Sequence, residues 1–387
     1  MTNERLTQAV LDDAVIDLGI GQPDPDLLPV TDLQAAASRV FDRYGPDVLG
    51  YGAPAGPPPT IAFIRARLAL TDARTPALDE IVTTAGNSHG LEQTVTLTTR
   101  PGDVVLVESP TYHLALRILR DHPVELVGIA SDEGGLRVDA VESALADVRR
   151  RGGAARLLYT VPTFNNPTGR SLAPERRHAL VDLAAAEGLT IVEDDTYREL
   201  VYDGPTPPSL WSLAEPGTVI RLGSFSKSLS PGLRAGYITA DAAMAARFVD
   251  SGLLDSGGGI SHLSSIVVAE FAADGSYAAN VERLRAAYRA RRDALVDALR
   301  ETVGDRARFE VPDGGYFVWV RLPEGVQSDG LGAAARAAGV DFVPGRVFHT
   351  DGDVAREGEA IRLAFSRYPA DRIAEGIRRL ARVVAPA

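Results

Sequence analysis

The sequence predicts an α/β fold in which a mostly parallel β-sheet is covered by helices. Short apolar runs that end in polar residues alternate along the chain with amphipathic stretches, which is the pattern of such a sheet. Polar residues collect at the carboxyl end of each run, where open α/β sheets bind ligands. The expected strands are Ile81–Thr84, Val104–Val107, Leu157–Val161, Leu189–Glu193 and Val219–Leu222.

Two helices and a second domain are expected around this sheet. One helix covers Ala173–Glu187, and a longer one covers Tyr277–Glu301, which is rich in Arg, Ala and Leu. The longer helix leads towards a smaller C-terminal domain that contains the strand-like run Gly315–Val320. We expect an N-terminal segment that joins the small domain at residues 1–44, a large domain at 45–275 and a small domain at 276–387.

The composition argues against several classes of function. The 387 residues carry a net charge of -12 with a pI near 5.1, which disfavours a nucleic-acid backbone or an anionic membrane as the main partner. There is no cysteine, so disulfides and thiolate metal sites are excluded, and no metal is expected. The N-terminus lacks an apolar signal core and no run approaches the roughly 18 apolar residues of a membrane span, so we expect a cytoplasmic protein.

Lys227 is the only lysine among the 40 basic residues of the chain. Arginine can replace most surface lysines, but a guanidinium cannot condense with an aldehyde, whereas a lysine amine can. The alternative is that a strong arginine bias left one lysine by chance. The neighbouring residues favour amine chemistry, because the strand ends supply what an aldehyde cofactor needs: an electron sink, a phosphate anchor and a hold on the substrate.

Three strand-end loops offer partners for the ring of such a cofactor. The carboxylate of Asp194 suits a protonated pyridine nitrogen, and Tyr197 and Asn166 can reach the neighbouring ring oxygen. Tyr112 can stack on a flat heterocycle. The alternatives are an acidic turn that caps a strand, an ordinary Asn-Pro-Thr-Gly turn, and a tyrosine that only packs.

Two further segments offer a phosphate anchor. Ser224, Ser226 and Arg234 flank Lys227 and supply hydroxyls and a guanidinium fork suited to a phosphate dianion. The run Gly86–Ser88 precedes an apolar helical stretch, so its backbone N–H groups can form an anion site at a helix N-terminus.

Five strings in one order carry a family resemblance: GSFSKSLSPGLRAG at residues 223–236, then NNPTG, EDDTY, PDGGYFVW and IRLAFS elsewhere in the chain. Together they resemble the class I/II aminotransferases of fold type I, which use pyridoxal 5'-phosphate, from about Gly19 to the C-terminus. The branch with kynurenine and 2-aminoadipate aminotransferases, and with the effector domains of aminotransferase-like regulators, is especially similar. The resemblance implies a large domain with a mostly parallel seven-stranded sheet between helices, and a smaller α+β domain.

The resemblance also implies roles for the cofactor-site residues. It makes Lys227 the residue that bonds covalently to the cofactor, and Asp194 the partner of the pyridine nitrogen. Asn166 and Tyr197 match the positions at the ring hydroxyl, and Tyr112 matches the stacking aromatic. The implied phosphate set is Asn87, Ser88, Ser224, Ser226 and Arg234, of which Asn87 and Ser88 depart from the serine and glutamine that relatives often carry.

For the substrate, the resemblance makes Arg362 the bidentate partner of the α-carboxylate, with Asn166 and Gly21 also at the substrate. Tyr51 matches a tyrosine that reaches the partner's phosphate across a dimer interface, which implies a homodimer with shared sites. The implied reaction is a ping-pong transamination between an amino acid and a 2-oxo acid, in which Lys227 moves the α-proton.

Two other functions stay open at this point. The same residues can serve a lyase, a cyclase or an oxygen-using deaminase on the same fold. A ligand-sensing regulator would need an added basic helix-turn-helix segment, for which we expect no room before residue 19. The segment Gly19–Leu28, which lines the side-chain pocket in this branch, holds Asp24 and Asp26 and no cation, which would disfavour an acidic substrate; alternatively, both aspartates only cap a turn.

Overall fold

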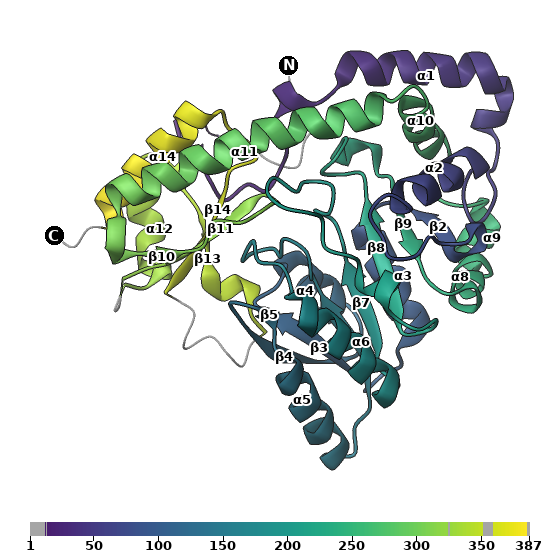
Figure 1. Ribbon diagram of the computed structural model, residues 1–387, viewed down its shortest axis with the longest axis horizontal. Coiled ribbons are helices and arrows are strands. Elements are labelled where there is room, and N and C mark those ends of the chain that lie inside the picture. The colour runs from purple at the N-terminus through teal and green to yellow at the C-terminus, as the bar shows by residue number, and fades with distance from the viewer. Residues whose placement is uncertain (1–11, 13, 324–325, 351–358, 385–387) are drawn as a thin grey trace.

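The computed structural model describes residue 12 and residues 14–323, 326–350 and 359–384. Its main feature is a sheet with the strand order β2-β9-β8-β7-β6-β3-β4-β5 (Figure 1). The strands are β2 (Ile81–Thr84), β3 (Val104–Ser109), β4 (Glu125–Asp132), β5 (Gly135–Leu136), β6 (Ala155–Thr160), β7 (Thr190–Asp194), β8 (Val219–Ser224) and β9 (Gly236–Thr239).

The sheet confirms the predicted α/β class. The pairs from β4 through β3, β6 and β7 to β8 are parallel, and only β9 and the two-residue β5 pair antiparallel with their neighbours. The five expected strands are β2, β3, β6, β7 and β8, with ends shifted by up to two residues. Strand β4 was not predicted, since it is only partly buried and its apolar pattern is weak. Without β5, the sheet has the seven strands that the resemblance implies.

Helices cover both faces of this sheet, as β3 illustrates. Val105 and Val107 pack against α3 (Asn87–Thr98), α4 (His113–Arg120) and α8 (Ala242–Val249). Val104 and Leu106 point the other way, towards α5 (Val138–Arg150) and α6 (Pro174–Glu187). Successive side chains of a strand alternate between faces, so an all-apolar run is what a doubly covered strand requires.

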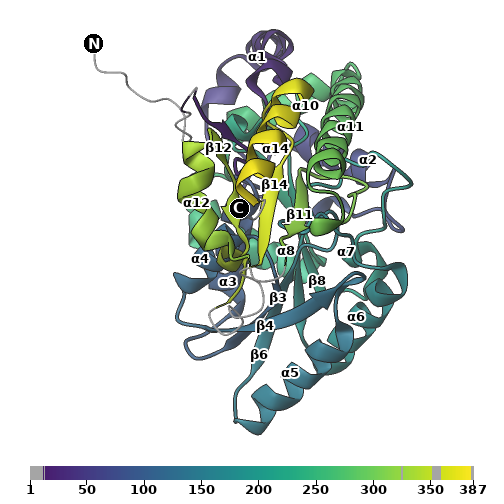
Figure 2. The same ribbon diagram turned by 90° about the vertical axis from the view of Figure 1, so that its left-hand side faces the viewer.

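A smaller sheet has the antiparallel order β10-β11-β14-β13. Its core is shared with the helices around it, and the N-terminal strand β1 pairs with β12 beside it. Figure 2 shows α12, α14 and β14 in the upper part of the molecule and α5 in the lower part. The elements are β1 (Ile16–Asp17), β10 (Arg308–Phe309), β11 (Phe317–Arg321), β12 (Val340–Asp341), β13 (Val343–Pro344), β14 (Ala360–Ala364), α11 (Ser276–Thr302), α12 (Ser328–Ala337) and α14 (Ala370–Val384).

Helices α1 (Val30–Tyr44), α2 (Pro58–Leu68), α9 (Gly252–Gly257) and α10 (His262–Ala272) lie on the side of the molecule towards the end of α11 that is remote from α14 (Figure 1). The short helix α7 (Leu210–Leu213) packs instead against α6 and β8. Among the residues with described structure, no helix combines the length and apolar character needed to cross a membrane. The expected domain boundaries and the cytoplasmic location stay predictions.

A buried ion network connects the loop after α2 with β7 and β8. Asp72 accepts hydrogen bonds from Arg198 at 2.7 Å and from Arg221 at 2.6 Å, and Arg221 lies 2.7 Å from the carboxylate of Asp195. Burial alone would raise the pKa of Asp72, but the two guanidinium groups outweigh it and hold the pKa below its usual range. Asp195 therefore has a structural role in this ion network, although it stands next to Asp194 in the sequence.

We expect Asp195→Asn to lower the free energy of unfolding by about 3 kcal/mol, because it leaves the two buried guanidinium groups of Arg198 and Arg221 with one carboxylate, Asp72, and so with an uncompensated buried charge. Urea unfolding followed by circular dichroism measures this loss. The control is Glu125→Gln, which breaks an exposed pair with Arg151 (2.9 Å) and should cost less than about 1 kcal/mol. Equal losses in the two variants would contradict a structural role for Asp195.

Candidate active site

The predicted site residues come together where β6, β7 and β8 end. Asp194 is the last residue of β7 and Ser224 the last of β8, and Lys227 follows three residues later. Arg362 comes from β14 of the smaller sheet, and the loop after β6 brings Asn166 to it. The site therefore lies between the two sheets.

Asp194 is buried and accepts three side-chain hydrogen bonds. Asn87 donates to Oδ1 at 2.6 Å and Thr196 donates to the same oxygen at 2.7 Å. The hydroxyl of Tyr159 donates to Oδ2 at 2.8 Å. Burial raises the pKa of Asp194, whereas these hydrogen bonds lower it.

None of these three donors was expected at Asp194. The resemblance implies a phosphate contact for Asn87, but its amide nitrogen is directed at Asp194, at Thr196 (2.8 Å) and at the carbonyl of Leu222 (3.1 Å). Tyr159 was missed because it lies inside the apolar run of β6, where a tyrosine signals only a strand.

The amine of Lys227 is buried, and the charges that act on it are the guanidinium groups of Arg362 and Arg234 and the carboxylate of Asp194. Its Nζ donates a hydrogen bond to the carbonyl of Gly21 at 2.9 Å and lies 5.3 Å from the centre of the Tyr316 ring. Burial, with a smaller effect of the Arg362 guanidinium, lowers the pKa of Lys227 to about 8. About one tenth of the amine is therefore neutral, and nucleophilic, at pH 7, whereas a lysine with an ordinary pKa would be almost wholly protonated.

Arg362 is a buried guanidinium that forms no ion pair with a carboxylate of the described chain. Its Nη1 donates to Asn166 Oδ1 at 2.8 Å and its Nη2 to the carbonyl of Gly19 at 2.5 Å, while its buried Nε has no partner among the described residues. The guanidinium carbon lies 4.2 Å from the ring centre of Phe317 and 5.0 Å from that of Phe348. Burial lowers the pKa of Arg362 to about 10, so it remains charged at neutral pH.

The N-terminal segment passes directly over this site. The carbonyls of Gly19 and Gly21 accept from Arg362 and Lys227, respectively. A side chain at Gly21 would come within 2.7 Å of the Phe317 ring, so the segment is closely packed there. Asp24 is paired with Arg291 at 2.6 Å and caps a short turn, as the structural alternative predicted, and Asp26 is exposed.

The predicted phosphate residues surround the N-terminus of α3. Arg234 donates to the carbonyl of Ala85 at 2.6 Å, and a side chain at Gly86 would come within 3.0 Å of its guanidinium. Ser224 and Ser226 share a 2.9 Å hydroxyl contact, and Ser224 pairs across the sheet with Gly236, which approaches Gly86. Ser88 lies in the first turn of α3. This arrangement offers N–H groups, hydroxyls and one guanidinium to an anion.

Three predicted tyrosines lie at different places. Tyr197 is buried, and burial raises its pKa, while the Asn166 side chain acts in the opposite direction. Tyr112 precedes α4 and is partly buried, with the charge of Asp194 adding to the effect of burial on its raised pKa. Tyr51 is 88% exposed on the single chain.

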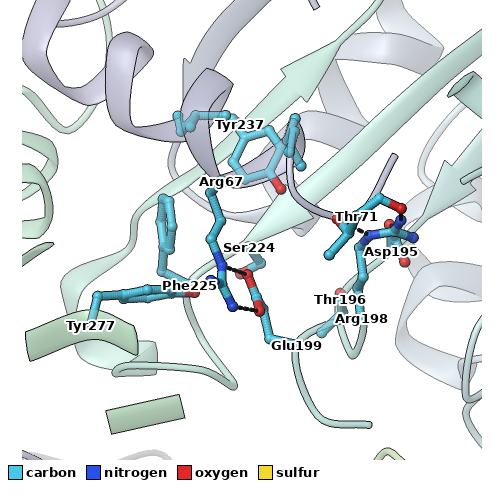
Figure 3. Close-up of a pocket in the computed structure, with 12 residues that line it drawn as sticks. Arg67, Thr71, Asp195, Thr196, Arg198, Glu199, Ser224, Phe225, Tyr237 and Tyr277 are labelled. Carbon is cyan, nitrogen blue, oxygen red and sulfur yellow. Dashed lines mark hydrogen bonds and ion pairs between the residues drawn. The ribbon is translucent and has the colours of Figure 1, made fainter. Parts of the chain in front are cut away.

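A small cavity of about 20 Å³ lies beside Ser224 and Thr196. Figure 3 shows Arg67 and Glu199 at this cavity, joined by two hydrogen bonds of 2.7 and 2.5 Å. The volume suits one water molecule, which needs about 10–15 Å³, and excludes a cofactor ring. The cavity is therefore part of the packed region next to the site and is not the cofactor pocket itself.

Comparisons with known proteins agree with this geometry. Residues 13–380 match the family model for aminotransferase class I and II. The chain is 33% identical to aromatic-amino-acid aminotransferase 1 of Thermococcus litoralis, with 96% of this chain and 88% of the relative covered. It is also 33% identical to 2-aminoadipate transaminase of Thermus thermophilus, with 96% and 90% covered.

A solved structure supports the same assignment. Kynurenine aminotransferase of Pyrococcus horikoshii, crystallised with PMP, superimposes with a TM-score of 0.89 at 31% identity, covering 96% of this chain and 91% of that one. The chain therefore belongs to the class I and II aminotransferases, the pyridoxal-phosphate-dependent enzymes that transfer amino groups between amino acids and 2-oxo acids.

Proposed function

We propose that this aminotransferase acts by a ping-pong mechanism in which one site binds the amino-acid donor and then the oxo-acid acceptor. The observation that carries the proposal is the buried guanidinium of Arg362, whose Nε has no partner and which pairs with no carboxylate of the described residues. A buried charge of this kind calls for a bound counter-ion. Donor and acceptor share an α-carboxylate, which a guanidinium binds in bidentate fashion.

The surrounding residues fit pyridoxal 5'-phosphate. We assign the phosphate to Arg234, Ser224, Ser226 and the first turn of α3 with Ser88, and the pyridine nitrogen to Asp194. The Nε of Arg362 has no partner among the described residues, so it is available to a substrate carboxylate. Gly86 has no side chain beside the guanidinium of Arg234, so that group is available to the phosphate. When bound, this cofactor supplies an electron-accepting ring that stabilises negative charge at the substrate α-carbon.

Lys227 is suited to bond to the cofactor and later to move the α-proton of the substrate. With a pKa of about 8 its amine can both accept and release a proton near neutral pH, which general acid–base catalysis requires. Asn166 holds Arg362 through its side-chain oxygen and so orients the carboxylate clamp. We assign Tyr197, with Asn166, to the ring hydroxyl and Tyr112 to the ring face.

We further propose that the preferred substrates have neutral side chains, aromatic ones included. Asp24 is neutralised by Arg291, so it offers no free charge to a basic substrate. Arg39, the first arginine of the segment that follows, pairs with Glu270 at 3.0 Å and so offers none to an acidic one. The rings of Phe317 and Phe348 beside Arg362 support contact with apolar groups, and one relative is named for aromatic amino acids.

We propose a homodimer in which Tyr51 completes the phosphate site of the partner. The exposure of Tyr51 supports this, as does an apolar groove of about 640 Å³ between α1 and α10. The apolar residues of its lining are Val30, Leu33, Ala37, Leu233, Leu263 and Val267, beside four polar ones, and Val30 is 67% exposed on the single chain. Exposed apolar surface of this kind marks protein interfaces.

A test of Lys227 uses borohydride, which makes a bond between lysine and cofactor permanent. The wild type should gain one cofactor mass on the peptide that contains Lys227, and Lys227→Arg should fold, bind phosphate and gain none, because a guanidinium cannot form the bond. Mass spectrometry of the digested protein measures this. Arg321→Lys, at the exposed end of β11, is the control, and a cofactor found on any other residue would contradict the assignment.

A second test separates transamination from lyase or oxidase chemistry. Without oxygen and without an acceptor, a good donor should release one 2-oxo acid per site and then stop, and an added acceptor oxo acid should restart turnover. Arg362→Lys should lower kcat/KM by about 10- to 100-fold for donor and acceptor together, because lysine loses the bidentate fork. Quantified oxo acid reports both effects. Continuous oxo acid or ammonia release without acceptor would refute the proposed mechanism.

A third test addresses the shared site by mixing two impaired variants. Lys227→Ala subunits and Tyr51→Phe subunits should form heterodimers in which one site carries both changes and the other carries neither. The intact site should work at near wild-type rate, so the activity of the mixture should exceed the sum of the two parents. Activity at or below that sum would place Tyr51 in its own subunit's site or outside any site.

A further inference from the structure

The acceptor sites of Asp194 are almost filled. A carboxylate offers about four lone-pair positions, two on each oxygen. Both positions on Oδ1 are taken, by Asn87 at 2.6 Å and Thr196 at 2.7 Å. Tyr159 takes one position on Oδ2 at 2.8 Å. One acceptor position therefore remains, and it is on Oδ2.

Tyr159 is held rigidly and stays a donor. It lies in β6, next to β7, with Val192 as its register partner, and its ring is fully buried in the core cluster that includes Val107 and Val192. Packing therefore fixes where the hydroxyl points. Burial, together with the negative charge of Asp194, raises the pKa of Tyr159 well above its usual value, so the hydroxyl remains protonated.

We propose that Tyr159 is a positioning residue, which holds Asp194 so that the free position on Oδ2 receives the N–H of the cofactor's pyridine ring. This inference rests on the proposed function, because it needs Asp194 to bind that nitrogen. Tyr159 does not reach the reacting atoms itself. It fixes the rotation of the carboxyl group and favours the charged form, since a hydrogen bond to a carboxylate stabilises the anion.

The charge of Asp194 depends on a balance between opposing effects. Burial raises its pKa, and the donors Thr196, Asn87 and Tyr159 lower it. Removal of the Tyr159 hydroxyl therefore raises the pKa further, so that Asp194 becomes protonated at a higher pH than in the wild type. The other titratable groups around it are Asp195, which is paired with Arg221, and Tyr112, Tyr197 and Lys227.

The test compares Tyr159→Phe with Tyr202→Phe. Both remove a buried tyrosine hydroxyl that donates one hydrogen bond, but Tyr202 donates to the carbonyl of Gly315 and not to Asp194. The first readout is the acid limb of the kcat profile, which should move to higher pH by about one unit in Tyr159→Phe only. The second uses cofactor-free protein, in which infrared spectroscopy follows the carboxyl band that Asp194→Asn abolishes, and the same shift is expected.

A variant of opposite sign covers the possibility that Tyr159→Phe does not fold. Site-specific 3-fluorotyrosine in place of Tyr159 keeps the ring and makes the hydroxyl a stronger donor, so both readouts should move to lower pH. Matching shifts in Tyr159→Phe and Tyr202→Phe, or no shift with 3-fluorotyrosine, would overturn the role of Tyr159. If the wild type itself neither binds the cofactor nor transaminates, the proposed function fails instead.

Discussion

The proposed role of Asp194, at the end of β7, requires a buried carboxylate to stay charged, and the hydrogen bonds around it serve that requirement. Asp194 is satisfied by Asn87 from α3, Thr196 from the loop after β7 and Tyr159 from β6. Buried polar groups are tolerated only when they are hydrogen-bonded. Asp194 thus connects a helix, a loop and a strand of the larger domain by hydrogen bonds at the proposed cofactor site.

A second feature is that two cationic groups lie close together, and neither forms an ion pair with a carboxylate of the described residues. Lys227 follows β8 and Arg362 lies in β14; burial lowers the pKa of both groups, and the guanidinium of Arg362 lowers that of Lys227 further. The neighbouring framework is organised in the opposite way, since Asp72, Asp195, Arg198 and Arg221 neutralise one another. Within the part of the chain that the structure describes, the buried charges of this network are thus paired, whereas Arg362, which we propose binds the substrate carboxylate, has no carboxylate partner.

Much of this could be predicted from the sequence, and the remainder depends on contacts between distant residues. Buried parallel strands and their polar ends are local signals. The strands β3, β6, β7 and β8 and the positions of Asp194 and Lys227 could therefore be predicted from the sequence. The amide of Asn87 meets an acid 107 residues away, and Asp24 meets Arg291 at a separation of 267 residues. No local pattern specifies such partners. Tyr159 was overlooked because a tyrosine is common in strands, so its presence in β6 gave no sign of its distant partner.

The carbonyls of Gly19 and Gly21 act as built-in competitors for the ligands of this enzyme. They accept hydrogen bonds from Arg362 and Lys227, the groups that we propose bind the substrate carboxylate and the cofactor aldehyde. An observed affinity is therefore a difference between two sets of hydrogen bonds rather than the strength of one. Substitutions in the N-terminal segment can therefore change the affinity for every substrate at once, without making contact with any substrate.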